Sequence, residues 1–368
     1  MKLSGRTITI DRTSIFCGDS LEPFSTFLKS LRGAVSGIIV LVDENTGRHC
    51  LPLLREAAPA LEDAFVMELP AGEGTKSMQT AMKIWEELLV AGADRKTLLV
   101  NLGGGMINDL GGFIAAGYKR GISYINIPTT LIGMVDAAIG GKTGVNFNGI
   151  KNQVGFFYMP SAVFISPGFL ATLPGEHLRS GMAEIMKVGL AGDAGIWRLV
   201  KTMPSSGWLT TRRKRLDELI LKSVVFKNSV VRKDYREKDV RKVLNFGHTI
   251  GHAFESFSMA GGRRPLTHGE AVAIGMICES YLSGLRGRID LNLVEEIRRV
   301  IDGFFPHYEF NEGDIPSLLS LMLQDKKNRE GRVGFTLLKG IGAPAINQTC
   351  EAPEIAEAIR YYQKVPGS

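Results

Sequence analysis

The feature that most constrains the fold is a change of hydrophobic pattern near the middle of the chain. In the first half, short β-branched runs such as SGIIVLVDENT alternate with helical patterns such as SMQTAMKIWEELLVAG. This alternation favours a parallel sheet with helices packed on its faces. From about Ser166 onward the patterns are mainly helical. We therefore predict an α/β domain over residues 1–167 and a mostly α-helical domain over residues 168–368, with the site in the cleft between them.

Composition narrows the classes of function. Of 368 residues, 44% are hydrophobic and 22% charged, as in ordinary soluble proteins. The net charge of +6 comes from dispersed Lys and Arg, so we predict no nucleic-acid partner; a small anionic substrate or a mildly basic surface explains the excess. No apolar run approaches the roughly 20 residues of a membrane span, and we predict a cytoplasmic protein. The four scattered cysteines suggest neither disulfides nor a zinc ribbon.

A glycine-rich segment, NLGGGMINDLGG, follows a predicted strand and opens a predicted helix. Backbone N–H groups at such a helix start attract anions, although the segment does not match G-x-G-x-x-G and could be a tight turn alone. Asp43 closes an earlier strand, where a carboxylate can bind a ribose. Glu73 and Lys76 lie in PAGEGTKS, just before a helix. Together these segments predict a nucleotide at the carboxyl ends of the strands.

Histidines and one glutamate suggest a metal site. His248 and His252 are four residues apart, which places both on one helix face. Glu184 lies in another helical pattern with Lys187 on the same side, and His268 begins a third. One carboxylate and two imidazoles are a usual set of catalytic zinc ligands. The spacing alone leaves open whether His248 and His252 are both ligands or only one of them is.

Basic and amide side chains accumulate near the same glycine-rich segments. Arg241, Asn245, His248 and His252 are spaced so as to share one helix face. Each cation alone is more often a surface residue, but together they favour a substrate that carries phosphate and carboxylate groups. The further members of this group are Lys142, Lys151, Asn152, Lys227, Lys326 and Lys327.

Several long segments, in order along the chain from about Asp43 to Gly342, resemble the 3-dehydroquinate synthase family. They include GGGMINDLGGFIAAGYKRG, IPTTLIGMVDAAIGGKTGVN, GIKNQVGFFYMP, LATLPGEHLRSGMAEIMKVGL, RKVLNFGHTIGHAFE and LTHGEAVAIGM. The resemblance implies a Rossmann-like NAD-binding α/β domain with a mostly α-helical C-terminal domain, and a homodimer. It implies catalytic use of NAD and a divalent metal, zinc or cobalt.

The implied activity converts 3-deoxy-D-arabino-heptulosonate 7-phosphate to 3-dehydroquinate and phosphate, in the shikimate pathway of aromatic amino acid biosynthesis. A substrate hydroxyl is transiently oxidised by NAD, phosphate is eliminated, the ketone is reduced again and an intramolecular aldol step closes the ring. Asn108 and Ala138 depart from residues common in the family, Gly and Ser, which affects only the detail of the NAD loop.

The resemblance also implies residue roles. The metal ligands would be Glu184, His248 and His268, so that His252 would face the substrate instead. The NAD-binding residues would be Asp43, Asn45, Glu73, Lys76, Gly103, Gly104, Gly105, Asp109, Thr129, Thr130, Lys142, Lys151, Thr172 and Leu173. The catalytic residues would be Lys142, Lys187, Lys227, Arg241, Asn245 and His252. Further substrate contacts would be Arg120, Asp136, Asn152, Glu237 and either Lys326 or Lys327.

Three other functions fit parts of this pattern. Cyclases that form 2-deoxy-scyllo-inosose or 2-epi-5-epi-valiolone share the NAD, metal and elimination chemistry, but their substrates lack the carboxylate. Metal-dependent polyol or glycerol dehydrogenases share the two-domain plan and carry out net oxidation. Their substrates lack phosphate and carboxylate groups, so the lysines predicted to bind such groups would have no purpose. A non-enzymatic binding protein with this fold is disfavoured because every proposed charged position is filled.

Overall fold

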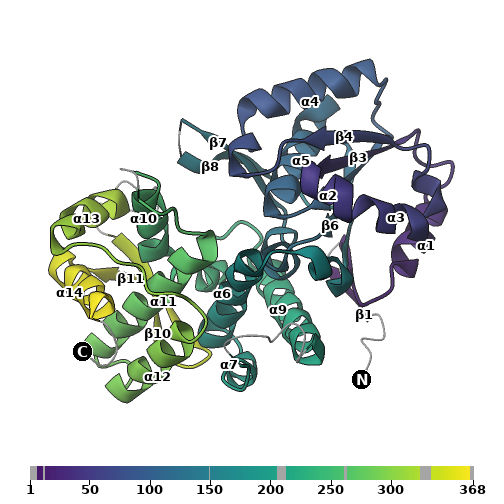
Figure 1. Ribbon diagram of the computed structural model, residues 1–368. Helices are drawn as coiled ribbons and strands as arrows, with labels where there is room; N and C mark the ends of the chain where they lie inside the picture. The colour runs from purple at the N-terminus through teal and green to yellow at the C-terminus, as the bar shows by residue number, and fades with distance from the viewer. Residues whose placement is uncertain are drawn as a thin grey trace. The chain divides into compact units, whose positions relative to one another are not determined.

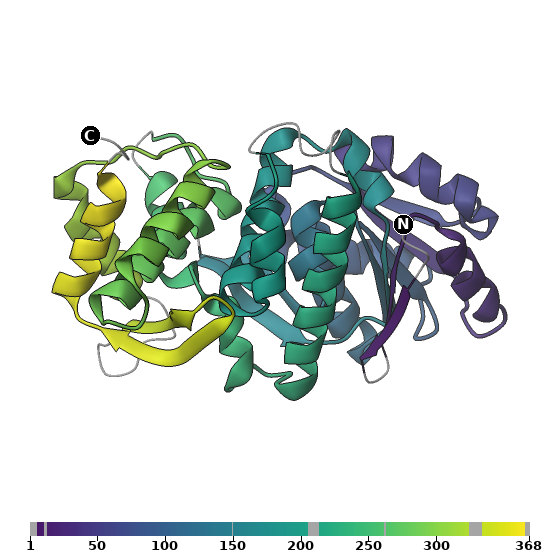
Figure 2. The same ribbon diagram turned by 90° about the horizontal axis from the view of Figure 1, so that it is seen from below.

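The computed structural model describes residues 6–10, 13–148, 150–204, 213–260, 263–323 and 333–364. The chain forms two compact units, Met1–Pro174 and Gly175–Ser368. Figures 1 and 2 show sheet and helices in the first unit and mainly helices in the second. The predicted fold class, an α/β part followed by a mostly helical part, is confirmed. The division expected from the sequence lies at 167/168, inside a 3₁₀ helix that belongs to the first unit.

A seven-stranded sheet with the order β1-β2-β9-β6-β5-β3-β4 forms the centre of the first unit. All neighbouring strands are parallel except β1, which pairs antiparallel with β2 at one edge. The strands are β1 (Arg6–Ile10), β2 (Thr13–Cys17), β3 (Ile38–Asp43), β4 (Phe65–Leu69), β5 (Leu98–Gly103), β6 (Ser123–Pro128) and β9 (Ala162–Ile165). Every residue of β5 is buried, as expected for a strand covered on both faces.

Helices and a hairpin complete this unit. Leu88, Phe113 and other apolar side chains of α4 and α5 pack with Leu41 and Leu99 of the sheet in one buried cluster. The α-helices are α1 (Glu22–Ser30), α2 (Glu44–His49), α3 (Leu51–Ala57), α4 (Met78–Val90) and α5 (Gly105–Gly117). The short helices are η1 (Pro59–Leu61), η2 (Glu73–Thr75), η3 (Tyr118–Arg120), η4 (Gly133–Ala137) and η5 (Pro167–Thr172), and the hairpin strands are β7 (Lys142–Phe147) and β8 (Ile150–Phe157).

The second unit is built around α11 (His268–Leu285), most of whose residues are buried. This helix packs against α6, α10, α12, α14 and β10. The other helices are α6 (Gly175–Ala191), α7 (Ala194–Val200), α9 (Arg213–Lys233), η6 (Val240–Asn245), α10 (His248–Ser258), α12 (Leu291–Asp302), η7 (Glu312–Asp314), α13 (Ile315–Leu323) and α14 (Ala352–Gln363). The antiparallel hairpin β10 (Val333–Gly340) and β11 (Ala343–Cys350) was not expected in this helical half.

Glycines allow α10 and α11 to cross in backbone contact. A Cβ on Gly275 of α11 would lie 1.9 Å from the carbonyl oxygen of Gly247 and 2.8 Å from the amide nitrogen of Gly251. A Cβ on Gly251 would in turn lie 2.8 Å from the carbonyl oxygen of Ala271. The two helices are therefore in backbone contact, and the start of α10 lies against the N-terminal half of α11. Both helices begin with a histidine.

Candidate metal centre and cofactor site

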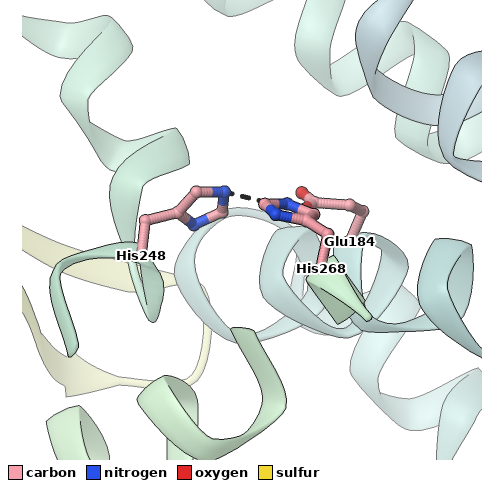
Figure 3. Close-up of side chains that lie close together, drawn as sticks. All are labelled: Glu184, His248 and His268. Carbon is pink, nitrogen blue, oxygen red and sulfur yellow. Dashed lines mark hydrogen bonds and ion pairs between the residues drawn. The ribbon is translucent and has the colours of Figure 1, made fainter. Parts of the chain in front are cut away.

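Three helices of the second unit each contribute one potential metal ligand. Glu184 lies on α6, while His248 and His268 are the first residues of α10 and α11. The Oε1 atom of Glu184 is 3.4 Å from Nε2 of His248 and 3.1 Å from Nε2 of His268, and Figure 3 shows the three side chains converging. Ligands of one tetrahedral ion at 2.0–2.2 Å lie roughly 3.3 Å apart. The donor atoms therefore fit a single divalent cation.

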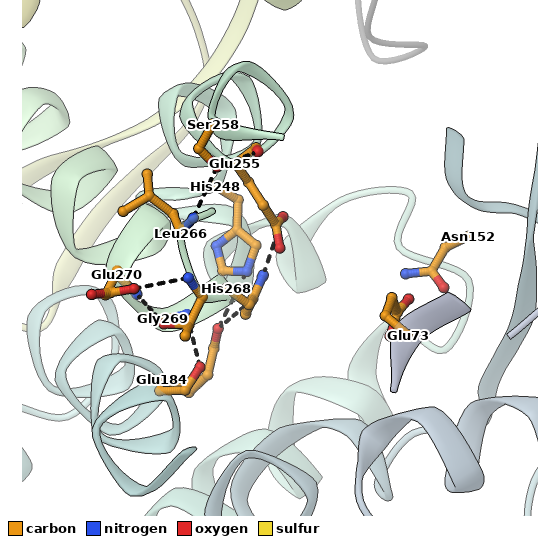
Figure 4. A network of polar contacts seen from close by, with 12 residues as sticks. Glu73, Asn152, Glu184, His248, Glu255, Ser258, Leu266, His268, Gly269 and Glu270 are labelled. Atoms are coloured by element: carbon orange, nitrogen blue, oxygen red, sulfur yellow. Dashed lines mark hydrogen bonds and ion pairs between the residues drawn. The ribbon is translucent and has the colours of Figure 1, made fainter. Parts of the chain in front are cut away.

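The second nitrogen of each ring faces an acceptor. Nδ1 of His248 lies 3.1 Å from the carbonyl oxygen of Phe246. Nδ1 of His268 lies 3.6 Å from Oε2 of Glu255, a buried carboxylate on α10 that Figure 4 shows beside the ring. Acceptors at Nδ1 favour the tautomer whose Nε2 lone pair is available for a metal. Both Nε2 atoms point toward Glu184, so the ring orientations agree with the donor spacing.

The start of α11 is fixed by its own sequence and by α6. Thr267 and Glu270 form a capping box, in which each side chain bonds the other's backbone N–H. The amide of Gly269 donates to Oγ of Ser180 on α6 at 2.8 Å. A Cβ on Gly269 would lie 2.2 Å from Cα of Ser180, so only glycine fits this contact. These bonds hold His268 next to the helix that carries Glu184.

The charges of this cluster compensate one another. Glu184 and Lys187 are almost completely buried and form an ion pair one helical turn apart. Burial alone would raise the pKa of Glu184, but Lys187 and His248 outweigh it and hold the pKa well below its usual range. Burial, together with Lys187, lowers the pKa of His248, which favours the neutral imidazole that a metal requires.

The metal-free state differs at His268. Burial disfavours its charged form, but the contacts with Glu184 and Glu255 outweigh burial and raise its pKa to about 10. In the absence of metal, both nitrogens of this ring are therefore protonated near neutral pH. A metal that binds at Nε2 must displace a proton from the ring.

His252 occupies the next turn of α10. Its ring centre is 5.3 Å from that of His248 and 6.0 Å from that of His268. His252, Glu255 and His268 form a second group whose potential ligand atoms lie within 4.8 Å of one another, so the two groups share His268. Only the first group unites the three ligands implied by the family resemblance.

The expectation that Arg241 and Asn245 share one helix face with His248 and His252 is wrong. The first two lie on the 3₁₀ helix η6, which ends at Asn245, and α10 begins anew at His248. Gly247 separates the two elements with a left-handed φ of 78°. A glycine adopts this conformation without the steric clash that a Cβ atom would cause. The turn at Gly247 interrupts the helical spacing on which the expectation relied.

The other proposed polar residues of this unit are held in place. Nη1 of Arg241 donates to the carbonyl oxygen of Tyr235 at 2.6 Å, and the Arg241 side chain is buried. Nδ2 of Asn245 donates to Oε1 of Glu237 at 2.6 Å. Lys227 lies buried on α9. Lys326 and Lys327 lie outside the described residues.

In the first unit, the proposed NAD-binding residues follow the carboxyl ends of parallel strands. Asp43 ends β3 and caps α2, which contains Asn45; Gly103 ends β5, and Gly104 is the residue just before α5. The chain runs from β3 outward to β4 and then returns to β5 on the other side of β3. Ligands of open α/β sheets bind at such a reversal of strand order. The remaining members follow β4 (Glu73, Lys76), β5 (Gly105, Asp109), β6 (Thr129, Thr130) and β9 (Thr172, Leu173), while Lys142 and Lys151 lie on the hairpin.

Lys76 connects several of these segments. Its Nζ atom donates to Oδ2 of Asp109 at 2.7 Å and to Oδ1 of Asn152 at 2.5 Å, and its side chain is buried. Nδ2 of Asn146 on β7 donates to Oε1 of Glu73 at 2.9 Å. Figure 4 labels Glu73 and Asn152, whose side chains lie near each other. The structure therefore joins Asn152, a proposed substrate contact, to two proposed cofactor residues.

Three proposed substrate residues have a left-handed backbone. The φ angles are 68° for Arg120, 53° for Asn152 and 54° for Glu237. This region is uncommon for Arg and Glu, and such residues concentrate at binding and catalytic sites. Asp136, also proposed to contact substrate, lies in the single-turn π-helix η4, another irregularity frequent at functional sites.

Four polar residues near these sites were not found from the sequence. Glu255 lies seven residues after His248 and three after His252, and this helical spacing could have revealed it. Glu279 is an acidic residue in the apolar run of α11, which is a signal for a buried role. Asn146 and Ser180 gave no such signal. Asn108, noted only as a departure from the family, braces the glycine turn because its Nδ2 donates to the carbonyl oxygens of Gly103 and Gly104 at 3.1 and 2.8 Å.

The fold and the donor set define a two-unit protein with an α/β sheet of nucleotide-binding type and a helical unit that has a candidate divalent-metal centre. Profiles of the N-terminal and C-terminal domains of 3-dehydroquinate synthase match residues 66–180 and 181–328. A 3-dehydroquinate synthase from Parabacteroides distasonis is 42% identical over 95% of this chain and 97% of its own length. The chain belongs to the 3-dehydroquinate synthase family.

Solved structures of related cyclases share the fold. A 2-deoxy-scyllo-inosose synthase complexed with carbaglucose-6-phosphate, NAD⁺ and Co²⁺ superposes with a TM-score of 0.84, at 26% identity, over 97% of this chain and 99% of its own. ValA, a 2-epi-5-epi-valiolone synthase from Streptomyces hygroscopicus with NAD⁺ and Zn²⁺ bound, gives a TM-score of 0.81 at 28% identity, over 97% of each chain. Within the residues that the structure describes, no helix is long and apolar enough to cross a membrane.

Proposed function

We propose that this protein is a 3-dehydroquinate synthase, a phosphate-eliminating lyase that converts 3-deoxy-D-arabino-heptulosonate 7-phosphate to 3-dehydroquinate and phosphate. The observation that carries the proposal is the Glu184–His248–His268 donor set, on a chain that both domain profiles of this family match. The reaction combines transient oxidation, elimination, reduction and an intramolecular aldol step. It is redox-neutral overall, so the cofactor is regenerated in each cycle.

The proposed metal is zinc or cobalt, held by Glu184, His248 and His268. Three protein ligands leave a coordination position open, as in catalytic sites. A divalent cation held by these residues would supply Lewis acidity for the oxidation of a substrate hydroxyl. Zn²⁺ and Co²⁺ are the metals of the related cyclase structures, which supports both candidates.

The proposed cofactor is NAD, which would supply a reversible hydride acceptor. Asp43 would bind the ribose, since its carboxylate lies at the end of β3. The amides of Gly104 and Gly105 begin α5 and would face the pyrophosphate. Gly104 must stay small, because a Cβ there would lie 2.9 Å from Cγ2 of Thr130.

The proposed substrate contacts of the second unit suit a molecule with two anionic groups, a phosphate and a carboxylate. Arg241 presents a guanidinium that the Tyr235 carbonyl oxygen already orients, so little side-chain entropy remains to be lost on binding. Lys187, Lys227, Asn245 and His252 add cations and hydrogen-bond donors for the phosphate and carboxylate groups. Glu237 and either Lys326 or Lys327 belong to the same proposed set, and the first unit would contribute Arg120, Asp136, Lys142 and Asn152.

One assay tests the activity. Purified protein receives the heptulosonate phosphate, excess Co²⁺ or Zn²⁺ and NAD at one tenth of the enzyme's concentration, and phosphate and dehydroquinate are measured. We expect both products in equal amounts and in large excess over NAD, because NAD is regenerated. NADH that accumulates without release of phosphate would instead indicate a dehydrogenase. A hexose phosphate without a carboxylate serves as the second substrate, and preferential turnover of it would favour a related sugar phosphate cyclase.

We also propose that the protein is a cytoplasmic homodimer. The hairpin β7–β8 supports the dimer, because Phe147, Ile150 and Phe156 are 45%, 56% and 45% exposed on a two-stranded ribbon. Clustered exposed apolar side chains are typical of contact surfaces. Light scattering after gel filtration should give twice the chain mass of 40.1 kDa. The variant Ile150→Asp should shift this mass toward the monomer, and a monomeric wild type would contradict the proposal.

A further inference from the structure

The helix that carries His248 cannot cap its own N-terminus. The N-cap position of α10 is Gly247, which has no side chain and has a left-handed φ of 78°. The N3 position is Ile250, whose side chain cannot accept a hydrogen bond. The first amides of a helix have no partner within the helix and must be satisfied from elsewhere. At this buried site, the partner must come from another part of the protein.

Glu279 of α11 provides this cap. The side chain is completely buried, and its Oε2 accepts the amide of Gly247 at 2.7 Å while Oε1 accepts the amide of Ile250 at 3.3 Å. In an ordinary capping box, the N-cap and N3 side chains of one helix bond these same two amides. Here a single carboxylate from a neighbouring helix performs both functions. Its two oxygens also lie at the positive end of the helix dipole.

The cap connects directly to the ring of His248. The N–H of Gly247 and the C=O of Phe246 belong to the same planar peptide group. Glu279 bonds the N–H side of this group, and Nδ1 of His248 lies 3.1 Å from its carbonyl oxygen. The opposite ring nitrogen, Nε2, faces Glu184 at 3.4 Å. One peptide group thus links the buried carboxylate to the imidazole, and hydrogen bonds in such a chain polarise one another.

We propose that Glu279 is a positioning residue for the metal centre, acting on His248 through the Phe246–Gly247 peptide. The proposal rests on the assignment of His248 as a metal ligand. Glu279 fixes the plane of this peptide, the peptide fixes the ring through Nδ1, and the ring presents Nε2 to the metal. The tight crossing of α10 and α11 explains why the cap comes from α11. A Cβ on Gly247 would lie 2.6 Å from Cγ of Met276, so a longer capping residue has no room on α10.

The test compares Co²⁺ binding by the wild type, Glu279→Gln, Glu279→Ala and a control, Asp290→Ala. Asp290 caps α12 by accepting the amide of Asn292 at 2.6 Å, so the control also removes a helix cap but has no link to His248. We measure the Kd for Co²⁺ by chelator competition, the Co²⁺ absorption spectrum and the thermal midpoint. We expect the Kd to rise about 10-fold in Glu279→Gln and about 100-fold in Glu279→Ala, with a shifted spectrum in both. The control should lose thermal stability with an unchanged Kd and spectrum.

Two results would overturn the inference in distinguishable ways. If the Glu279 variants lose stability like the control but bind Co²⁺ with the wild-type Kd and spectrum, the cap is structural and does not position His248. If the wild type binds no Co²⁺, the ligand assignment itself fails, and the inference falls with it. If Glu279→Ala does not fold, Glu279→Gln decides, because it keeps the shape of the side chain and one accepting oxygen.

Discussion

Replacement of Glu184 by Gln is expected to abolish stoichiometric metal binding and catalytic turnover. The side chain is 1% exposed, and its Oε1 atom is the one that faces both His248 and His268. A neutral amide is a far weaker ligand for Zn²⁺ or Co²⁺ than a carboxylate. Metal content by elemental analysis and phosphate release measure the two losses. A Glu184→Gln protein that retains one tightly bound metal would contradict the ligand assignment.

The same substitution should also destabilise the metal-free protein. Glu184 forms an ion pair with Lys187, which is 2% exposed, so the variant leaves a buried ammonium beside a neutral amide. Breaking one side of a buried pair costs up to about 3–5 kcal/mol. The double variant Glu184→Gln/Lys187→Met removes this charge and should recover part of the stability without recovering metal. Chemical denaturation in the presence of a chelator measures both variants, and full recovery of metal binding in the double variant would refute the argument.

Local patterns predicted the elements that need no distant partner. The segment from β5 through the glycine turn to α5 was recognised because a buried strand, a turn and a helix each have a sequence period or signature. The same holds for α4, which ends where Ala91-Gly92 predicted. The hairpins β7–β8 and β10–β11 were not found, because their strands are short and depend on each other and on the surrounding unit.

The candidate site likewise contains residues that the sequence could predict and contacts that it could not. Proposed NAD-binding residues could be found because the carboxyl end of a strand can be read from the sequence, as for Asp43 and Gly103. The link from Lys76 to Asn152 could not be read, because it joins residues 76 positions apart through a folded hairpin. The cap of α10 by Glu279 is equally hidden, since it depends on how two helices cross rather than on either helix alone.

The helix break before His248 has a more specific cause. The spacing of Arg241, Asn245, His248 and His252 fits a continuous helix, and glycine within a helical pattern costs only about 1 kcal/mol. Gly247 nevertheless adopts a left-handed conformation and ends the pattern. The crossing with α11 selects this conformation, because the Gly247 carbonyl oxygen lies against Gly275. Tertiary packing therefore overrides a local periodicity at the point where the metal ligand begins its helix.

Substitution of Gly275 by Ala is expected to separate α10 from α11 and to disrupt the metal centre without touching a ligand. The added Cβ would lie 1.9 Å from the carbonyl oxygen of Gly247, a backbone atom that cannot rotate away as a side chain can. Overpacking of this kind costs typically about 1–3 kcal/mol. The helices can relieve the overlap only by moving apart, and such a shift moves His248 relative to His268 and strains the bond from Glu279 to Gly247.

The thermal midpoint of the Gly275→Ala protein should fall by roughly 2–10 °C. Its Kd for Co²⁺ should rise at least about 10-fold, because ligand atoms must be held to within about 0.5 Å of their bonding positions. Gly313→Ala is the matched control, since a Cβ at that position meets no atom within 4 Å and the backbone is not left-handed there. The control should bind Co²⁺ like the wild type. If Gly275→Ala also binds Co²⁺ with the wild-type Kd, the close crossing is not what holds the two histidines in place for the metal.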